Sequence, residues 1–584
     1  MQLLSEKLNA CLCTLNRNDS TYVGDITWLN DFCAEFLAFS NAMQKLIGQE
    51  MEQGVLDVVC LCLMQIVICI RHLESTIQTE STSKTRIQAS HQHFIDRIMV
   101  CLRRMSDALD QSKNQEAAQQ NSLEAVSFQS VLDSLLDALT DFMEPQQDKC
   151  RIGEQNMDIG AKHIKSDIDL LLGQALSFAN VALQQDKKAL SALCQKVMRD
   201  CSAFENECQS KTNYCHQKLR AMTLQHALHQ LDDHINDALL RLVFTCFMDF
   251  QKISVDKIRN IMRTESDATI DEYIADFDVN LDRATQIGIF AIVYAPGLKI
   301  KTMVRSCLAS FEYLDTSLIP SLQTNASDLH SELLEQHFKE EISKYKTALH
   351  EIIESRAFVA CYLQILTTGI IASEKQFDKL HLDDLVHMGF IVLEHFQLEI
   401  NQKDWLPHGR ECFENFIRIL RECKAILSCA SQVQTERILK RFKILRTILR
   451  KFSSTISADE NEPERNEKTV IEETTDEYTI EGISTDLICT QPSIILYETR
   501  KDRCNNIGNR PALKANAATL KSKPVGGVRR KQSLRTTMFK RHNCAQSNHS
   551  QNTISNQSAS LEITGILDQL TCLSSTLTHN LTRK

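Results

Sequence analysis

The chain of 584 residues has very little of the two residue types that interrupt helices, with eight prolines and sixteen glycines. Only four prolines lie before residue 456, at Pro145, Pro296, Pro320 and Pro407. Aromatic residues are also few, at 6%, whereas hydrophobic residues of all kinds make up 43% of the chain. Because proline breaks helices and glycine destabilises them, this composition predicts an overwhelmingly helical protein with cores of Leu, Ile, Ala and Val.

The sequence motifs of the common nucleotide-binding and hydrolytic enzymes are missing as well. The chain contains no G-x-x-x-x-G-K-[ST], G-x-G-x-x-G, G-x-S-x-G or H-E-x-x-H pattern. Di-iron helical bundles need inward-facing Glu-x-x-His pairs, and none occurs before the C-terminal tail. We therefore expect a non-enzymatic protein with no catalytic residues and no cofactor.

The best candidate for a metal site is one group of cysteine and histidine side chains: Cys215, His216, His226, His229 and His234. A helix would put His226 and His229 on one side, with His234 turned away and Cys215 three turns distant. Zinc needs four ligands in a tetrahedron, so solvated histidines beside acidic residues are the better account. We expect no metal.

Cysteine is abundant, with twenty-two residues, yet a disulfide framework is not indicated. The N-terminal segment has charged residues inside its apolar run and no cleavage-site pattern, which argues against a signal peptide. A reducing, intracellular compartment is expected, in which most thiols act as small core residues. The most apolar window, 55–70, is too short to span a bilayer and carries Asp57 and Gln65. It predicts a buried central helix, with a membrane-inserted hairpin as the alternative.

The segment 161–200 has no proline and only one glycine, Gly173. Its apolar residues are spaced alternately four and three apart, which keeps one side of an α-helix dry. At Leu183 this stripe moves over by one residue and then resumes. We expect one helix that continues to about residue 219. Since the first forty residues alone would span about 60 Å at 1.5 Å per residue, such a rod is best explained as shared between two packed bundles.

Similar spacing between polar turns predicts the remaining helices, near 3–15, 28–47, 55–78, 87–111, 123–142, 222–263, 268–294, 299–317, 326–372, 377–402, 408–430 and 434–452. The predicted fold class is all-α, with tandem up-and-down four-helix bundles that share a long helix and with a disordered C-terminal tail. The domains expected are paired N-terminal bundles over 1–265 that share the 161–219 helix, a C-terminal bundle over 266–456 that ends in a basic helix, and a charged tail over 457–584.

The last predicted helix combines an apolar seam with an unusual density of cations around it. The seam is formed by Ile438, Phe442, Leu445, Leu449 and Phe452. Seven basic residues surround it against a single acid, Glu436, and they are Arg437, Lys440, Arg441, Lys443, Arg446, Arg450 and Lys451. This pattern fits either a solvated face around a packed seam or an electrostatic platform for a polyanion such as an acidic filament, an anionic lipid surface or nucleic acid.

The composition changes after Ser457 into blocks of one charge. Segment 459–486 has eleven acids against Arg465 and Lys468, and segment 500–541 has thirteen Lys or Arg against Asp502. Such blocks cannot bury a core, so the tail is expected to be disordered. The basic stretch 528–533 ends in Ser533 and fits a linker, an import signal or a kinase site, and the apolar-periodic segment 561–573 could fold on a partner. Aromatic stacking partners are missing from the basic stretch, which argues against nucleic acid.

The long helical stretch and its neighbours resemble the vinculin/alpha-catenin superfamily over roughly residues 1–455. The likeness lies in LLLGQALSFANVALQQDKKAL, in RATQIGIFAIVYAP (283–296) and in VRSCLASFEYLDTSLIPSL after it. The start TWLNDFCAEFL (27–37) and the length fit a developmental member most closely. The resemblance implies stacked helical bundles and a cytoplasmic adaptor, peripheral at the inner face of the plasma membrane, that ties actin filaments there during cellularisation of a syncytial embryo. The superfamily's complete actin-binding bundle is not matched after residue 455.

Two function hypotheses follow. The first is an actin-associated structural protein, with filaments bound directly or indirectly and with the basic helix as the candidate site for actin or an anionic membrane. The second is a helical regulatory module that recruits a partner's amphipathic helix at its N-terminal bundles without contacting actin.

Overall fold

The computed structural model describes residues 2–15, 26–50, 53–111, 127–143, 153–209, 214–264, 267–325, 327–403 and 405–456. Over these ranges the protein is all-α, which confirms the predicted fold class, and an isolated bridge pairs Trp405 with Ile456. The helices in chain order are α1 (Gln2–Leu15), α2 (Ile26–Glu50), α3 (Gln53–Ser83), α4 (Gln88–Gln111), α5 (Phe128–Met143), α6 (Gly153–Val181), α7 (Gln184–Gln209), α8 (Tyr214–Lys252), α9 (Val255–Thr264), α10 (Asp267–Ile292), α11 (Leu298–Thr324), α12 (Leu329–Ile352), α13 (Ser355–Lys375), α14 (Lys379–His395), α15 (Gly409–Ser428) and α16 (Thr435–Ser453), with short 3-10 turns η2 (Glu399–Gln402) and η3 (Ala430–Gln432).

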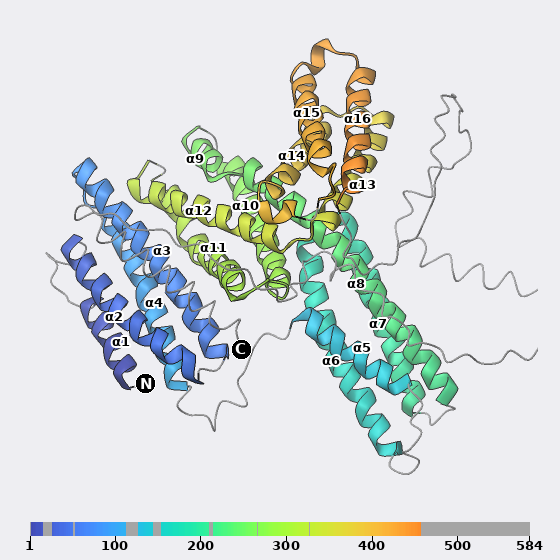
Figure 1. Cartoon of the computed structure of the whole chain (residues 1–584), viewed down its shortest axis with the longest axis horizontal. Coiled ribbons are helices and arrows are strands. Elements are labelled where there is room, and N and C mark those ends of the chain that lie inside the picture. The colour runs from blue at the N-terminus through green and yellow to red at the C-terminus, as the bar shows by residue number, and fades with distance from the viewer. Residues whose placement is uncertain are drawn as a thin grey trace, which may run out of the picture.

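The helices form groups that follow one another along the chain (Figure 1). Helices α1–α4 lie together at one side, α9–α12 in the middle, α5–α8 at the other side and α13–α16 above them. The predicted boundary at 265/266 falls on residues outside the described ranges. The helices on either side of it, α9 and α10, contact each other, and the division into domains stays a prediction. The tail 457–584, including Ser533 and segment 561–573, also lies outside the described residues.

Helix α3, which contains the apolar window 55–70, is a core helix of the first group. Within the described ranges two segments, Gly54–Ser83 and Ser355–Lys375, are long and apolar enough to cross a membrane, with 67% and 44% of their apolar windows buried inside the protein. Helix α3 packs against α2, α4, α11 and α12, and its two polar residues Asp57 and Gln65 are buried against α11. This packing favours the interpretation of window 55–70 as a buried central helix.

The predicted rod over 161–219 is wrong. Helix α6 ends at Val181, α7 begins at Gln184, and the two pack against each other as an antiparallel hairpin. The ammonium of Lys165 lies 2.7 Å from a carboxylate oxygen of Glu205 across this hairpin. The one-residue shift of the apolar stripe at Leu183 coincides with the turn between the two helices. Just after it, Asp186 in the first turn of α7 pairs with Arg241 of α8 at 2.8 Å.

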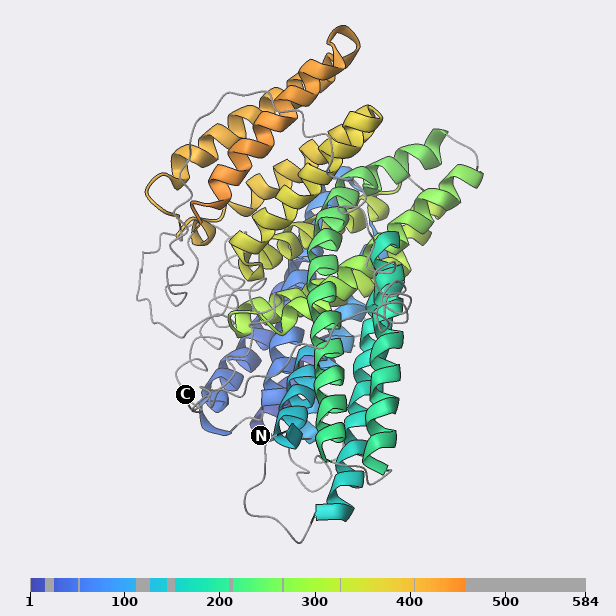
Figure 2. The same cartoon turned by 90° about the vertical axis from the view of Figure 1, so that its right-hand side faces the viewer.

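The long helix shared between groups is α8, with 39 residues. Its first part packs on α7, with Lys196 of α7 hydrogen-bonded to Gln230. Its last part packs on the other groups: Phe244 stacks on Phe358 of α13 at 4.3 Å, and Lys252 pairs with Asp384 of α14 at 2.5 Å. Figure 2 shows α8 running upright from the α5–α7 group to the others. A shared helix is therefore present, one hairpin later in the chain than the sequence indicated.

Other helix boundaries also differ from the predictions, and the helix expected over 222–263 is divided between α8 and α9. The helix expected over 326–372 is interrupted between α12 and α13, where the Glu354 carboxylate accepts hydrogen bonds from the backbone of Arg356 and Ala357 and so caps α13. Pro320, expected at a turn, lies inside the last part of α11. The N-terminus of α14 is capped in a similar way by Asp378, whose side chain accepts from the backbone of Leu380.

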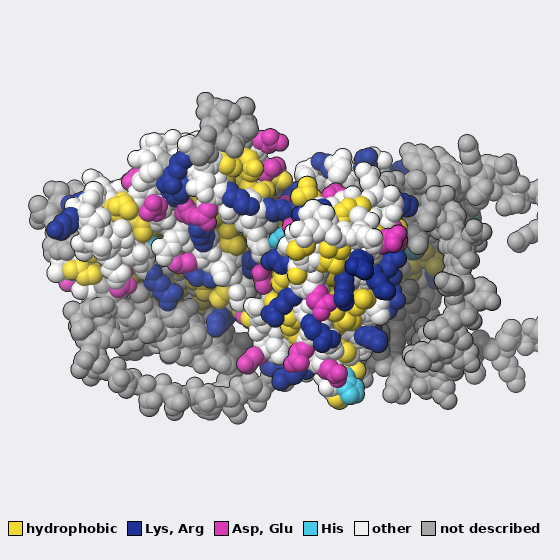
Figure 3. All heavy atoms as spheres, turned by 90° about the horizontal axis from the view of Figure 1, so that it is seen from above, with side chains coloured by type: hydrophobic (Ala, Val, Ile, Leu, Met, Phe, Trp, Pro, Cys, Tyr) yellow, Lys and Arg dark blue, Asp and Glu magenta, His cyan; other side chains and the backbone are white. Residues whose placement is uncertain are grey.

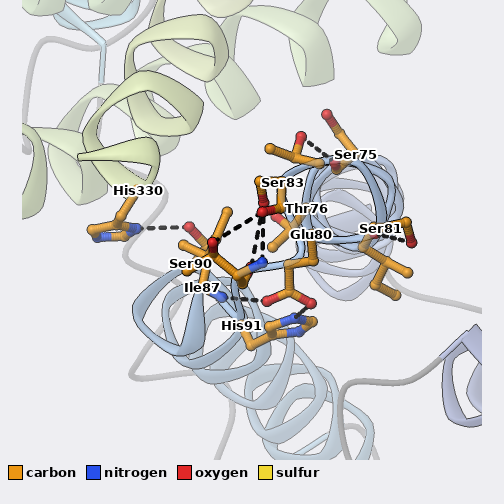
Figure 4. A network of polar contacts seen from close by, with 12 residues as sticks. Ser75, Thr76, Glu80, Ser81, Ser83, Ile87, Ser90, His91 and His330 are labelled. Atoms are coloured by element: carbon orange, nitrogen blue, oxygen red, sulfur yellow. Dashed lines mark hydrogen bonds and ion pairs between the residues drawn. The ribbon is translucent and has the colours of Figure 1, made fainter. Parts of the chain in front are cut away.

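The turn between α3 and α4 is held by side chains of both helices (Figure 4). The Glu80 carboxylate accepts a hydrogen bond from the backbone of Ile87 and lies 3.0 Å from His91 Nε2, while Lys84 adopts a left-handed backbone with a φ of 55°. Ser90 Oγ is 2.8 Å from His330 Nδ1 of α12. The turn is thus fixed to the helical group beside it.

Cysteine acts as a core residue in the described part of the chain. Thirteen of its seventeen free cysteines there are buried, including Cys194, Cys201 and Cys208 along the inner side of α7. Burial raises the pKa of the Cys201 thiol to about 11. A neutral, buried thiol is a poor nucleophile, and this agrees with a packing role.

Candidate interaction surface

Helix α16 is an amphipathic helix whose apolar face packs against the other helices of the last group. Its predicted seam is buried, with Ile438, Phe442, Leu445, Leu449 and Phe452 all shielded from solvent against α13 and α15. Glu436 lies in its first turn, and Arg450 and Lys451 lie in its last turn. Acids at the start and cations at the end of a helix favour its macrodipole, so the charge pattern also supports the helix itself.

The seven cations predicted as a site lie together on this helix, but not in equal surroundings. Arg441 pairs with Glu422 of α15 at 3.2 Å, and Lys443 pairs with Glu374 of α13 at 2.7 Å. Arg446 is half-buried. Arg441 and Lys443 thus join α16 to the neighbouring helices, and Arg446 is the least exposed of the seven.

The other four cations, Arg437, Lys440, Arg450 and Lys451, are exposed and make no ion pair with the described residues. On a helix of 3.6 residues per turn, Lys440, Arg450 and Lys451 project to the side opposite the seam, and Arg437 lies at its edge. We name these four the outward cations. They are the part of the predicted site that is open to a partner.

The hairpin of α15 and α16 is strongly basic as a whole. Between residues 409 and 453 it has eleven Lys or Arg against four Asp or Glu. Figure 3 shows dark blue side chains gathered on the end of the α13–α16 group that faces the viewer, with yellow hydrophobic atoms among them. A cluster of one charge on a protein of net charge -10 produces a local positive potential.

A groove of about 600 Å³ runs along α15 beside this surface. Its walls hold apolar Ile417 and Ala425 between Arg418, Arg421, Glu414 and Glu422. Glu422 is also the partner of Arg441, so the groove adjoins α16. The surface therefore combines cations with a small apolar strip.

The histidines and cysteine considered as metal ligands are not brought together as a site. Cys215, His216 and His226 are exposed, His226 Nε2 contacts Gln230 at 3.0 Å, and His234 lies 3.8 Å from Asp186. Burial lowers the pKa of His234. Across the described ranges no group of three or more His, Cys, Asp or Glu side chains could hold a metal ion.

A serine–histidine pair occurs, but it is sealed in the core. Ser355 Oγ lies 3.0 Å from His395 Nε2, and His395 Nδ1 lies 3.2 Å from His350 Nδ1. Ser355, His350 and His395 are each 3% exposed or less, and Asn401 donates to the backbone carbonyls of His350 and His395. A substrate cannot reach them, so the network holds α12, α13 and α14 together.

Sequence reasoning missed a polar seam that joins the first helical group to α11 and α12. Gln65 of α3 donates to Ser306 Oγ and Ser310 Oγ of α11 at 2.7 and 2.9 Å, and Arg97 of α4 donates to Gln65 Oε1 at 2.9 Å. Asp57 pairs with Lys301 of α11 at 2.9 Å. The available signal was the placement of Asp57 and Gln65 in an otherwise apolar helix.

Histidines line the same junction. His72 lies against His337 of α12 with ring centroids 4.2 Å apart, and His93 lies against Tyr313 of α11 at 4.4 Å. Burial lowers the pKa of His72 to about 4 and that of His93 to about 3, and it holds the pKa of His337 well below its ordinary value. All three rings are therefore neutral near pH 7.

Known proteins match most of the chain. The family described as Serendipity locus alpha protein (SRY-A) matches residues 1–485. Serendipity locus protein alpha of Drosophila virilis is 36% identical over 471 residues, which cover 77% of this chain and 87% of that protein. The protein of the same name from Drosophila subobscura is 37% identical over 473 residues, 78% of this chain and 85% of that protein. Among solved structures, a vinculin homolog from a sponge aligns with a TM-score of 0.50 and 11% identity, over 78% of this chain and 59% of that chain, which is a likeness of fold.

Proposed function

The chain belongs to the Serendipity locus alpha protein family, and from that premise we propose that it is a non-enzymatic adaptor of the actin cytoskeleton at the inner face of the plasma membrane. The fold shared with the sponge vinculin homolog supports placing it in the vinculin/alpha-catenin superfamily. The process that we propose for it is cellularisation of a syncytial embryo.

The observation that carries this proposal is the set of outward cations on α16. Arg437, Lys440, Arg450 and Lys451 project from a helix whose apolar side is fully packed, so their charges are presented by a rigid element. Actin filaments and the cytoplasmic leaflet are both polyanionic surfaces, and each cation near an anionic membrane contributes about 1 kcal/mol. A buried active site is not needed for this function.

A charge-reversal experiment tests the proposal. The full chain is sedimented with actin filaments and, separately, with vesicles that contain phosphatidylserine. Replacement of Arg437, Lys440, Arg450 and Lys451 by Glu is expected to weaken binding to at least one of the two by about tenfold or more. Arg441 and Lys443 are left in place because they pair with neighbouring helices, and Arg446 because it is half-buried.

The matched control reverses four exposed cations of other helices: Lys187, Lys188, Arg199 and Lys299. It changes the net charge by the same amount and should bind as the unmodified chain does. If the α16 variant binds both surfaces as tightly as the control, the outward cations are not the site.

The groove on α15 favours a second candidate function, recruitment of a partner's amphipathic helix. Ile417 and Ala425 offer an apolar strip between charges of both signs, as a helix-binding groove requires. The test is binding of helical peptides to the full chain and to an Ile417→Glu variant. A fragment that ends at residue 265 is unsuitable, because without α11 the buried Asp57 and Gln65 lose the partners that this helix supplies, Lys301 and Ser306.

A further inference from the structure

The chain itself contains a polyanion that fits the outward cations. We propose that the acidic segment 459–486 binds the outward cations of α16 in the same molecule and so competes with external polyanions. The contact itself is a property of this chain. Only its regulatory effect rests on the proposed function.

The described chain ends beside the C-terminal end of α16. Ile456 is buried and forms a bridge with Trp405, while Leu406 N donates to the carbonyl of Thr455 at 2.8 Å. Phe452 packs against the Trp405 ring at 5.6 Å. These contacts fix residue 456 beside the C-terminal end of α16, where Arg450 and Lys451 lie, so the acidic segment starts next to two of its four target charges.

The acidic segment is long enough to extend along the whole row of outward cations. The distance along α16 from Lys451 to Arg437 is about 21 Å, at 1.5 Å per residue. The acids Asp459, Glu460, Glu462, Glu464 and Glu467 all follow within eleven residues of Ile456, and eleven extended residues span up to about 36 Å. Even the nearest five acids can therefore reach every outward cation without any change in the helical groups.

The charge of the acidic segment is opposite to that of the outward cations. Segment 459–486 has eleven acids and two bases, whereas α16 itself has one acid, Glu436, and Glu374 and Glu422 of the neighbouring helices are already paired with Lys443 and Arg441. Each exposed pair contributes only about 0–1 kcal/mol. Because the segment is tethered at residue 456, however, its effective concentration at α16 reaches the millimolar range, and several weak pairs then suffice.

Zero-length cross-linking detects the contact directly. A carbodiimide couples a carboxylate to a lysine amine only when the two touch, and the full chain is treated at a dilution at which it is monomeric. Peptides that join segment 459–486 to Lys440 or Lys451 are expected. Their absence, or their appearance only between differently isotope-labelled chains, would overturn the proposal.

Vesicle binding tests the competition. Neutralising Asp459, Glu460, Glu462, Glu464 and Glu467 to Asn or Gln in the full chain should remove the cross-links and tighten binding to phosphatidylserine vesicles by about three- to tenfold. The matched control neutralises Asp271, Glu272, Glu312, Asp315 and Glu332, exposed acids on α10–α12, and should change neither result. Equal affinity of both variants would contradict the competition. If cross-links form but no variant binds vesicles or actin, the contact stands and the proposed function fails.

Discussion

The carboxylate of Asp57 in α3 lies 2.9 Å from the ammonium of Lys301 in α11, and Arg305 of the same helix contacts the same oxygen. Burial raises the pKa of Asp57, but the hydrogen bonds and charges of Lys301 and Arg305 outweigh burial and hold that pKa below its ordinary value. Helix α3 is thus attached to a helix more than two hundred residues later by a charged contact as well as by apolar packing.

Removal of both cations should leave the buried Asp57 carboxylate without its two ion-pair partners on α11. The Lys301→Ala, Arg305→Ala variant is expected to lose about 2–4 kcal/mol of unfolding free energy, since breaking a buried pair from one side is more costly than removing the pair. Urea unfolding measures this. Lys299→Ala, at an exposed position on the same helix, is the control and should change stability by less than about 0.5 kcal/mol.

The histidines at the junction predict sensitivity to acid. Histidine has a pKa of about 6.5 in the unfolded chain. That of His93 in the native protein is about 3, because burial lowers it and the charges of His330 and Arg97 add to the effect. Between these two values the unfolded chain binds a proton that the native protein excludes, so stability falls as the pH falls below about 6.5.

Replacement of His93 tests this. Between pH 7 and about pH 5, His93→Gln should lose about 1–2 kcal/mol less unfolding free energy than the unmodified chain. His226→Gln, on the exposed side of α8, should show the unmodified pH dependence. Identical pH profiles for all three proteins would show that His93 takes up its proton equally in both states.

The α6–α7 hairpin can be told apart from a continuous rod by chemistry. Lys165 and Glu205 lie 2.7 Å apart, whereas forty residues of continuous helix would separate them by about 60 Å. Carbodiimide treatment should therefore join these two residues in the native protein. Glu205→Gln removes the carboxylate and should abolish that product, whereas a rod would give no product in either protein.

Close packing in the last helical group leaves no free space for a larger side chain at Gly389. A Cβ atom at Gly389 would lie 2.5 Å from Leu420 Cδ1 and 2.7 Å from Tyr362 Oη. Gly389→Ala should cost about 1–3 kcal/mol, because a filled core can accept a methyl group only by strain. Gly173→Ala, where nothing lies within 4 Å, should be neutral or stabilise α6 by up to about 1 kcal/mol. Thermal unfolding of both variants decides this.

The sequence predicted those features that depend on local periodicity. The seam of α16, from Ile438 to Phe452, is buried as its spacing indicated. This follows from which residues share one side of a helix, and that is fixed by 3.6 residues per turn.

Features that depend on distant partners were not predictable in this way. The shift of the apolar stripe at Leu183 was visible in the sequence. That Arg241 of another helix lies beside this turn and binds Asp186 could not be predicted from the spacing. Likewise, only the position of α11 shows that Asp57 and Gln65 face Lys301 and Ser306. Within the basic helix, Arg441 and Lys443 differ from the outward cations by their partners on α15 and α13, and spacing within α16 alone does not reveal those partners.

The dependence of binding on salt tests the central claim most directly. Affinity of the full chain for phosphatidylserine vesicles and for actin filaments is measured over a range of salt concentrations, for the unmodified protein and for the variant with Arg437, Lys440, Arg450 and Lys451 reversed to Glu. If the outward cations form the contact, affinity falls steeply with salt in the unmodified protein, and the variant binds weakly with little dependence on salt. Equal affinities and equal salt dependence in both proteins would contradict the account.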